Sequence, residues 1–405
     1  MSNPGINSFP PAQALDGVRF SRGAGPAFEE FCDRVLASLP RSDQRRYGRQ
    51  YLGGLLQVEG RKSSRNLSTL NGRHPDEQRL HHFVNASSWQ WEPVRRAAAS
   101  YLLTAAPPVA WVIGSLHIRK YGRHAAGVER RYVPGLGQTI NAQLALGLWA
   151  SSVNLLVPVD WTLVLSRHWL EDPVRRARVA IPPHLTWSPL VDSVAHSALH
   201  PLQAWNLPAL PVVVDARELD VELLAGHFQR AAFPVLMRIG EHQRLTVTDP
   251  ALRGVCPPNL PVHRILHVFR HGRRLIGWPP GARLAAPQTG LEASVRVRLG
   301  SGAPQGSADE GGEYLLVAGG RRGHGWPSEL WLTDMTAMPP SLILRMGTAL
   351  QRVSQEAALT GDYVGLRDFS GRSYAGWHRH MTLVSAAFAA AALGRPYFAR
   401  QEPAA

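Results

Sequence analysis

The first third of the chain carries apolar residues at three- and four-residue spacing, with charged residues between them. This is the period of an amphipathic α-helix, because side chains at these spacings share one helix face. The pattern recurs in four segments, AFEEFCDRVLASL, DQRRYGRQYLGGLLQ, DEQRLHHFVNAS and EPVRRAAASYLL. It predicts an all-helical domain over residues 27–105, preceded by a disordered or extended stretch over residues 1–26.

The period changes at about Val109, where short runs of β-branched and other apolar residues begin. These runs are AWVIGSLHI, AQLALGLWASS, NLLVPVDWTLVL and LPVVVDA. Residues 192–206 and 219–233 return to helical spacing between or after the runs. Such alternation predicts an α/β domain over residues 106–400, with a mixed sheet flanked by helices.

The region near residues 232–335 is dominated by strand-like runs, among them FPVLMRIG, RLTVTD, ASVRVRLG and EYLLVAGG. Residues 300–312 are rich in glycine and are predicted to form an exposed loop, because a strand-like run follows them directly. We therefore predict a strand-rich insertion within the α/β domain. Two helices, at residues 340–359 and 377–393, are predicted to close the chain.

The charge balance narrows the range of partners. The 405 residues carry a formal net charge of +14, and Lys62 and Lys120 are the only lysines. An arginine-rich surface attracts polyanions, and guanidinium groups bind phosphate in bidentate geometry. Coding bias explains part of the arginine content, but the sign of the net charge acts on partners whatever its origin.

Cysteine usage and hydropathy exclude several classes of protein. Cys32 and Cys256 are too few for a disulfide framework or a thiolate zinc site, which is typical of a reducing cytoplasm. The beginning of the chain lacks a basic segment followed by an apolar core, so we expect no signal peptide. The longest apolar run, in MTLVSAAFAAAALG, is shorter than the roughly 20 residues of a membrane span, which predicts a buried helix and no membrane partner.

Arginine clusters with neighbouring aromatic residues recur along the chain, in RRYGR, VRRAA, VERRY, VRRARVA and FRHGRRL. Phosphates pair with guanidinium groups and bases stack on aromatic rings, so the pattern favours nucleic acid. The alternative is a solvated basic face without a partner. The repetition of the clusters on a basic chain leads us to predict nucleic-acid binding.

Other chemistry has weak support in the sequence. His81 and His82 are adjacent on a predicted helix, and His378 and His380 are two positions apart, so neither pair can easily bind one ion. The sequence contains no GxxxxGK[ST] and no GxSxG, and no GxGxxG opens a helix after a strand. These observations argue against nucleotide-binding and hydrolase functions.

One carboxylate occupies a position that suits a ligand site. The run Val212, Val213 and Val214 is apolar on both faces of the predicted strand, and Asp215 follows it directly. Open α/β sheets bind their ligands at the carboxyl ends of such strands. A single carboxylate does not hold a catalytic metal, so the identity of its partners decides the function.

The chain resembles insertion-sequence transposases with an RNase H-like DDE domain, of the group whose type member is insertion sequence seven-hundred-and-one. The resemblance spans most of the chain and depends on the order and spacing of its motifs. These are RRYGRQYLGGLL, EGRKSS, RLHHFVNASSWQWEPVR, GVERRYVPGLGQTINAQ with Asn141 and Gln143, VDWTLVLSRHWLEDPVRRARVAIP, LPVVVDA, SELWLTD and GLRDFSGRSYAGWHRHMTL. The resemblance implies an RNase H-like mixed sheet.

It also implies two-metal chemistry, in which two aspartates and one glutamate hold Mg²⁺ or Mn²⁺ at the attacked phosphate. Asp215 matches the second aspartate. Gly114 and Ser115 occupy the first position, where family members have paired aspartates, and no Asp or Glu occurs between Val109 and Val128. His117 shares a strand face with Ser115 but carries no negative charge.

The third acidic position also lacks its carboxylate. Family helices carry Trp-x-Ile-Glu, and the matching stretch LQRVSQEAALTG aligns Ser354 with the glutamate and Gly361 with a following lysine. Glu356 is a candidate substitute, although two residues along a helix turn its side chain by about 200°. With two carboxylates missing, Asp215 is interpreted either as a strand-end relic or as a residual metal ligand.

We therefore expect a transposase-like protein that binds double-stranded DNA in the cytoplasm, on the nucleoid, and is impaired in DNA strand cleavage and transfer. A homo-oligomer on DNA is compatible with this expectation. Two alternatives stay open: an active transposase whose site uses Asp215, Glu356 and Asp160, and a remnant without function. The predicted DNA contacts are Arg45, Arg46, Arg49, Lys62, Arg130, Arg131, His378 and Arg379.

Overall fold

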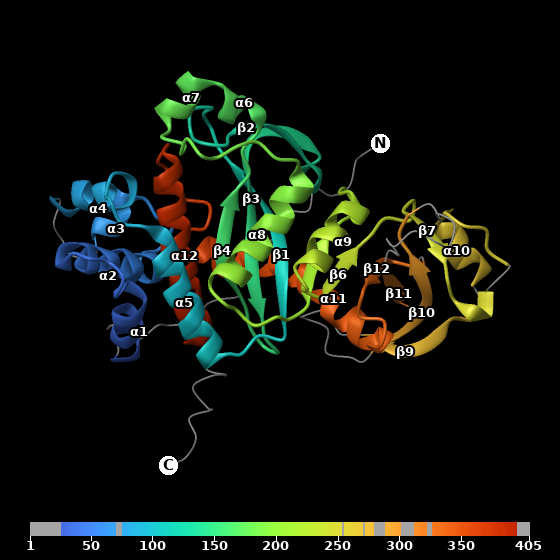
Figure 1. Cartoon of the computed structure of the whole chain (residues 1–405). Helices are drawn as coiled ribbons and strands as arrows, with labels where there is room; N and C mark the ends of the chain where they lie inside the picture. Colours follow the sequence, from blue (N-terminus) through green and yellow to red (C-terminus); the bar gives the residue numbers. More distant parts are fainter. Residues whose placement is uncertain are drawn as a thin grey trace, which may run out of the picture. The chain divides into compact units, whose positions relative to one another are not determined.

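The computed structural model describes residues 26–69, 75–252, 255–269, 272–278, 288–300, 312–321 and 326–394 (Figure 1). Residues 1–25 of the predicted N-terminal stretch, and residues 301–311 of the predicted loop, lie outside the described residues. The chain divides into two compact units. The helical unit contains the chain up to Tyr101, Glu356–Ser370 and the chain from Arg379; the sheet unit contains Leu102–Gln355 and Gly371–His378.

Helices build the helical unit. They are α1 (Pro26–Leu36), α2 (Ser42–Gln57), α3 (Ser64–Ser68), α4 (Pro75–Asn85) and α5 (Trp91–Ala105), joined by most of α12 (Tyr374–Leu393). All of those before α12, except the short α3, lie where the apolar spacing predicts them. The apolar faces of the helices form a common core, in which Leu52, Leu55, Leu80, Val94 and Phe388 are fully buried. The helical prediction thus extends to the C-terminal helix, which the sequence placed in the α/β domain.

The sheet unit begins with an antiparallel meander. Strands β1 (Ala110–Arg119), β3 (Gln138–Ser151) and β4 (Leu156–Leu163) pair in the order β1-β3-β4, and β2 (Glu129–Val133) pairs with the beginning of β3. Their nearly continuous apolar content is explained by burial, since ten successive residues from Ala142 to Ser151 are buried.

Two parallel strands extend the meander on the other side of β1. These strands are β5 (Val212–Asp215) and β6 (Val235–Arg238), in the order β3-β1-β5-β6. Helices α8 (Leu190–Ala204) and α9 (Val221–Arg230) precede β5 and β6 and pack on the sheet, while the short helices α6 (Arg167–Glu171) and α7 (Pro173–Arg178) follow β4. This mixed sheet with flanking helices is consistent with the predicted RNase H-like fold.

The predicted strand-rich insertion continues the same sheet. It contains β7 (Arg244–Val247), β8 (Leu260–Pro261), α10 (Val262–Val268), β9 (Arg274–Trp278), β10 (Gln288–Arg298), β11 (Glu313–Arg321) and β12 (Glu329–Thr333). β12 pairs antiparallel with β6, and β11 and β10 follow it outward. The chain therefore returns to the core at β12, which lies next to β6, the strand after which β7 to β11 are inserted.

Helix α11 (Pro340–Glu356) is fixed on the sheet by two close contacts with glycines. A Cβ atom at Gly347 of α11 would lie 2.3 Å from the ring of Trp331 on β12. Near the other end of α11, a Cβ atom at Gly114 of β1 would lie 2.4 Å from Cγ1 of Val353. Because neither glycine can accept a side chain without movement, these two contacts set the position of the helix on the sheet.

Candidate functional site

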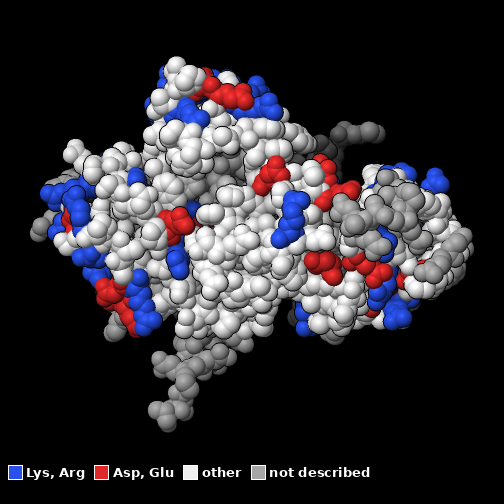
Figure 2. Space-filling model, in the orientation of Figure 1, with Lys and Arg blue, Asp and Glu red and all other residues white. Residues whose placement is uncertain are grey.

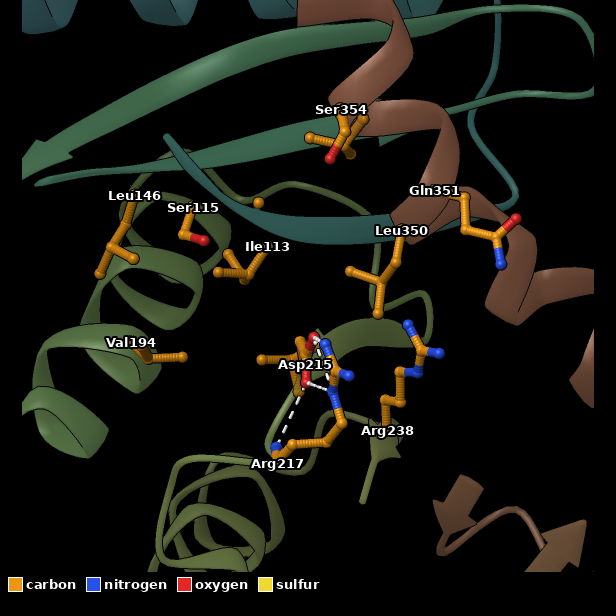
Figure 3. Close-up of a pocket in the computed structure, with 13 residues that line it drawn as sticks. Ile113, Ser115, Leu146, Val194, Asp215, Arg217, Arg238, Leu350, Gln351 and Ser354 are labelled. Carbon is orange, nitrogen blue, oxygen red and sulfur yellow. Dashed lines mark hydrogen bonds and ion pairs between the residues drawn. The ribbon is translucent and has the colours of Figure 1, made fainter. Parts of the chain in front are cut away.

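A pocket of about 240 Å³ lies where β5 ends and β1 continues (Figure 3). Its lining brings together the four positions that the sequence assigned to the acidic site, Gly114, Ser115, Asp215 and Ser354. Strands β1 and β5 supply the first three positions, and α11 supplies Ser354. The remaining walls combine apolar side chains with two arginines that sequence reasoning did not single out, Arg217 and Arg238.

Strand register identifies which of the two candidate positions on β1 stands beside Asp215. β1 and β5 are parallel, and Ile113 is the partner of Val214, so Gly114 is the next position opposite Asp215. Side chains alternate between the two faces of a strand, which places Ser115 on the opposite face from Gly114. Ser115 is exposed and pairs with Leu146 of β3. The register therefore places position 114 beside Asp215, although both positions line the pocket.

The space for a side chain at position 114 is filled by other residues. A Cβ atom there would lie 2.4 Å from Cγ1 of Val353 and 3.2 Å from Nε1 of Trp149. Gly114 pairs with Gly147 of β3, where a Cβ atom would lie 2.7 Å from both Trp149 and Trp161. This pair of glycines lies beneath two indole rings and a valine, so an aspartate at position 114 would collide with the core.

Asp215 is held by an arginine two residues further along the chain. Nε of Arg217 donates to Oδ1 at 2.9 Å, Nη2 donates to Oδ2 at 2.6 Å, and the Arg217 backbone N–H donates to Oδ1 at 3.2 Å. Arg238 of β6 is the register partner of Asp215. Burial raises the pKa of the Asp215 carboxyl group, but the Arg217 hydrogen bonds and the charge of Arg238 outweigh burial and leave its pKa below the ordinary value.

Helix α11 contributes neutral groups to the pocket. Ser354 takes the third position with a hydroxyl group, and Gln351 lies one turn before it. The Gln351 side chain is fixed by a hydrogen bond in which its Nε2 donates to Oε1 of Glu329 on β12 at 2.8 Å. Glu329 is itself buried and accepts from the indole N–H of Trp331, so this carboxylate supports α11 and does not line the pocket.

The other acids considered from the sequence do not line the pocket. Glu356 accepts a hydrogen bond from the Thr360 hydroxyl at 2.8 Å within the helical unit. Asp160 is buried on β4, a strand that pairs with β3. His117, two residues beyond Ser115, also lies outside the lining; burial and the charge of Arg131 lower its pKa. None of these residues supplies the charge missing beside Asp215.

The donor set of this pocket does not fit a pair of divalent metals. Mg²⁺ and Mn²⁺ are bound mainly by anionic oxygens. Here the single lining carboxylate is already in an ion pair with Arg217, position 114 has no room for an acid, and position 354 offers only a hydroxyl group. In the part of the chain that the structure describes, no cluster of three His, Cys, Asp or Glu side chains could hold a metal ion.

The predicted DNA contacts fall into three groups: exposed arginines, arginines paired within the protein, and buried residues. Arg46 and Arg130 are exposed, and Arg46 lies over the ring of Tyr47 with Cζ 4.9 Å from the centroid. The remaining arginines of the same clusters have partners within the protein. Arg45 donates to the Leu39 carbonyl, Arg49 pairs with Glu29 and Asp33, and Arg131 pairs with Glu129.

Lys62, His378 and Arg379 are buried, which argues against the predicted role of these three residues in contacting DNA. Lys62 donates to the Val58 carbonyl and lies 5.1 Å from the centroid of the Tyr363 ring. Arg379 donates to the carbonyls of Trp89 and Val84 at 3.0 and 3.2 Å. His378 packs against aromatic neighbours in the sheet unit. These polar groups stabilise the fold.

Sequence reasoning missed the residues that close the acidic site. Arg217 follows Asp215 by two positions in the sequence. An arginine so close to a candidate metal ligand can form an ion pair with it, and this signal was available from the sequence. Arg238 and Val353 carried no such signal, because they reach the pocket only through sheet pairing and helix packing.

Comparison with known proteins is consistent with this geometry. No curated protein matches the chain. The family model described as DDE superfamily endonuclease matches residues 34–260, more than half of the 405 residues. The matched range includes Gly114 and Asp215 and ends before α11. The sheet, the position of Asp215 at its strand end and this match together show that the chain belongs to the DDE superfamily endonuclease family.

Proposed function

We propose that this protein binds double-stranded DNA as a transposase of the insertion-sequence seven-hundred-and-one group does, but does not cleave DNA with metal ions. One observation carries the second part of the proposal: Gly114 stands beside Asp215 on β1, and a Cβ atom there would lie 2.4 Å from Cγ1 of Val353. The packing of α11 on β1 therefore leaves no room for an acid at position 114, and no Asp or Glu occurs between Val109 and Val128 that could take its place.

The chemistry supports the same conclusion. Two-metal cleavage requires ligands that hold both ions beside the attacked phosphate. The pocket contains one carboxylate and two guanidinium groups, so its formal charge is positive before any ion binds. A divalent cation entering it would meet repulsion from Arg217 and Arg238 and would compete with Arg217 for Asp215.

Exposed arginines support DNA binding in each unit. In the sheet unit, Arg130, Arg167 and Arg178 are exposed, and Cζ of Arg167 lies 3.9 Å from the centroid of the half-exposed Trp187 ring. Figure 2 shows blue basic side chains over α6 and α7, at the top of the view, with red acidic side chains between them. Guanidinium groups beside accessible aromatic rings can pair with phosphates and stack on bases.

The alternative of an active transposase with a rearranged site is not supported, because it requires carboxylates from Glu356 and Asp160. Neither residue lines the pocket. We propose that the protein acts as a binding protein on DNA in the cytoplasm, at the nucleoid. No helix in the described part of the chain has both the length and the apolar content that a lipid bilayer requires.

A nicking assay tests this proposal. The purified chain is incubated with Mg²⁺ or Mn²⁺ and a supercoiled plasmid that carries the DNA flanking its gene, and Asp215→Ala is prepared in parallel. We expect no nicking above the level of Asp215→Ala, while both proteins shift a labelled duplex in EDTA. Metal-dependent nicking by the natural sequence that Asp215→Ala abolishes would overturn the proposal, and failure to shift any duplex would reject DNA binding.

A further inference from the structure

We propose that the pocket at Asp215 binds a phosphate group directly through Arg217 and Arg238, without a metal ion. The proposal deepens the proposed function, because DNA is the source of phosphate that it implies. It can be tested independently of that function, because binding of inorganic phosphate can be measured without DNA.

The charges in the pocket favour an anion. Asp215 supplies one negative charge, against the positive charges of Arg217 and Arg238. Arg217 is paired with Asp215, whereas Arg238 has no ion pair among the residues that the structure describes. Because a single carboxylate faces two guanidinium groups, the pocket keeps a net positive charge, and phosphate oxygens match the donor geometry of a guanidinium group.

The geometry leaves donors available for such a ligand. Asp215 occupies Nε and Nη2 of Arg217, so Nη1 remains for another acceptor. Figure 3 shows both arginine side chains rising beside Asp215 toward α11, where Ser354 offers a hydroxyl group. The apolar walls at Ile113 and Val194 weaken competition from water and strengthen the charge interaction. The volume of about 240 Å³ accommodates a phosphate group.

Asp215 then acts as a positioning residue. Its carboxylate holds the guanidinium plane of Arg217 at two points, which orders a flexible side chain before a ligand arrives. The residue that matches a metal ligand of the family thus organises a cation in place of the metal. An asparagine at this position retains one oxygen acceptor for Arg217 and removes the negative charge.

Thermal unfolding of the full chain in EDTA tests the proposal, with inorganic phosphate compared against chloride at equal ionic strength. We expect phosphate to raise the unfolding temperature of the natural sequence. Arg217→Gln and Arg238→Gln should each weaken phosphate binding about tenfold, the loss expected for a charge-assisted hydrogen bond. The matched control Arg244→Gln removes the same charge from an exposed position on β7 and should leave the response unchanged.

Two further variants separate phosphate binding from metal binding and from misfolding. Asp215→Asn should bind phosphate at least as tightly as the natural sequence, because the pocket gains net positive charge; a metal-mediated site would lose phosphate binding. Ser115→Asp adds a carboxylate at an exposed lining position that can accept a side chain, and should weaken the phosphate response without lowering stability. An unaltered response in Ser115→Asp, Arg217→Gln and Arg238→Gln would refute the proposal.

A competition experiment with duplex DNA tests whether the phosphate that the pocket binds is a DNA phosphate. Competition between phosphate and a labelled duplex, lost in Arg238→Gln but kept in Arg244→Gln, would support a DNA phosphate as the ligand. Equal DNA affinity in all variants, together with equal phosphate responses, would reject the phosphate pocket and leave DNA binding intact. An arginine-dependent phosphate response without any DNA binding would keep the pocket and reject the proposed function.

Discussion

Val353 of α11 occupies the space that any side chain at Gly114 of β1 would need, with Cγ1 2.4 Å from the Cβ position. Helix packing therefore leaves no room for an acidic side chain at the position beside Asp215. Because Trp149 borders the same space at 3.2 Å, the closure comes from two elements of the fold. Recovery of an acidic site would require changes in the core as well as in the missing acids.

Gly114→Asp should destabilise the protein. The new side chain must displace Val353 or Trp149 and bury a charge, and overpacking alone costs about 1–3 kcal/mol. Urea unfolding followed by circular dichroism measures the loss. The adjacent Ser115→Asp is the matched control, because position 115 is exposed, and it should change the free energy of unfolding by less than about 0.5 kcal/mol. Equal effects of the two substitutions would contradict the packing argument.

Val353→Ala should rescue part of the loss caused by Gly114→Asp. Shortening Val353 removes the methyl group that a Cβ atom at position 114 would meet. In a double-mutant cycle, the two substitutions together should be less destabilising than the sum of their separate effects, with a coupling of about 0.5–3 kcal/mol. Additive effects would show that the collision does not involve Val353.

Affinity for duplex DNA should depend on the exposed arginines. If about five phosphates are neutralised, log K should fall against log salt with a slope of about −4 to −5. Arg46→Ala and Arg130→Ala should each weaken binding and reduce the slope by about 1, because both side chains are exposed. Fluorescence anisotropy over a salt series measures both quantities, and a flat salt response would reject the electrostatic mode of binding.

Arg379→Ala should lower stability before it affects DNA affinity. Its guanidinium group is buried and donates to the carbonyls of Trp89 and Val84, so its removal leaves two buried acceptors unsatisfied. We expect a loss of about 2–5 kcal/mol in the free energy of unfolding. Comparison with Arg46→Ala in the same denaturant series provides the control. An Arg379→Ala protein of unchanged stability with weakened DNA binding would restore this residue to the DNA surface.

Lys62 should make stability depend on pH. Burial lowers the pKa of its ammonium group from 10.5 to about 8, against the opposing attraction of Asp368 and Glu59. Between these pH values the unfolded chain binds a proton that the folded chain has released, so the free energy of unfolding should rise with pH. The effect of Lys62 is best measured between pH 8 and 9. Burial raises the pKa of the Cys32 thiol from 9.0 to about 12, so above pH 9 this group makes the free energy of unfolding fall with pH and opposes the effect of Lys62.

Lys62→Met should flatten this pH dependence, since methionine keeps the apolar stem and removes the titrating group. Lys120→Met is the matched control, because Lys120 is the only other lysine of the chain and is half-buried. Urea unfolding at several pH values compares the three proteins. A pH dependence that persists in Lys62→Met would assign the proton to another group.

Local periodicity was sufficient for most of the fold. Three- and four-residue spacing identifies α1, α2, α4 and α5, and apolar runs identify β1, β3, β4 and β5, because each pattern shows which side of a single element is buried. Chain order was insufficient for α12, most of which belongs to the helical unit although the sequence assigned it to the α/β domain. A helix that is apolar on all sides does not reveal which core it joins.

The sequence by itself determined that Asp215 follows a buried apolar run and that positions 114, 115 and 354 carry no acid. Only the tertiary structure decided which residues surround them. Arg238 reaches Asp215 through the pairing of β5 with β6, and Val353 reaches Gly114 through the packing of α11 on β1. These contacts join residues more than twenty positions apart in the chain, and such proximity arises from the packing of the whole sheet, which no local pattern records.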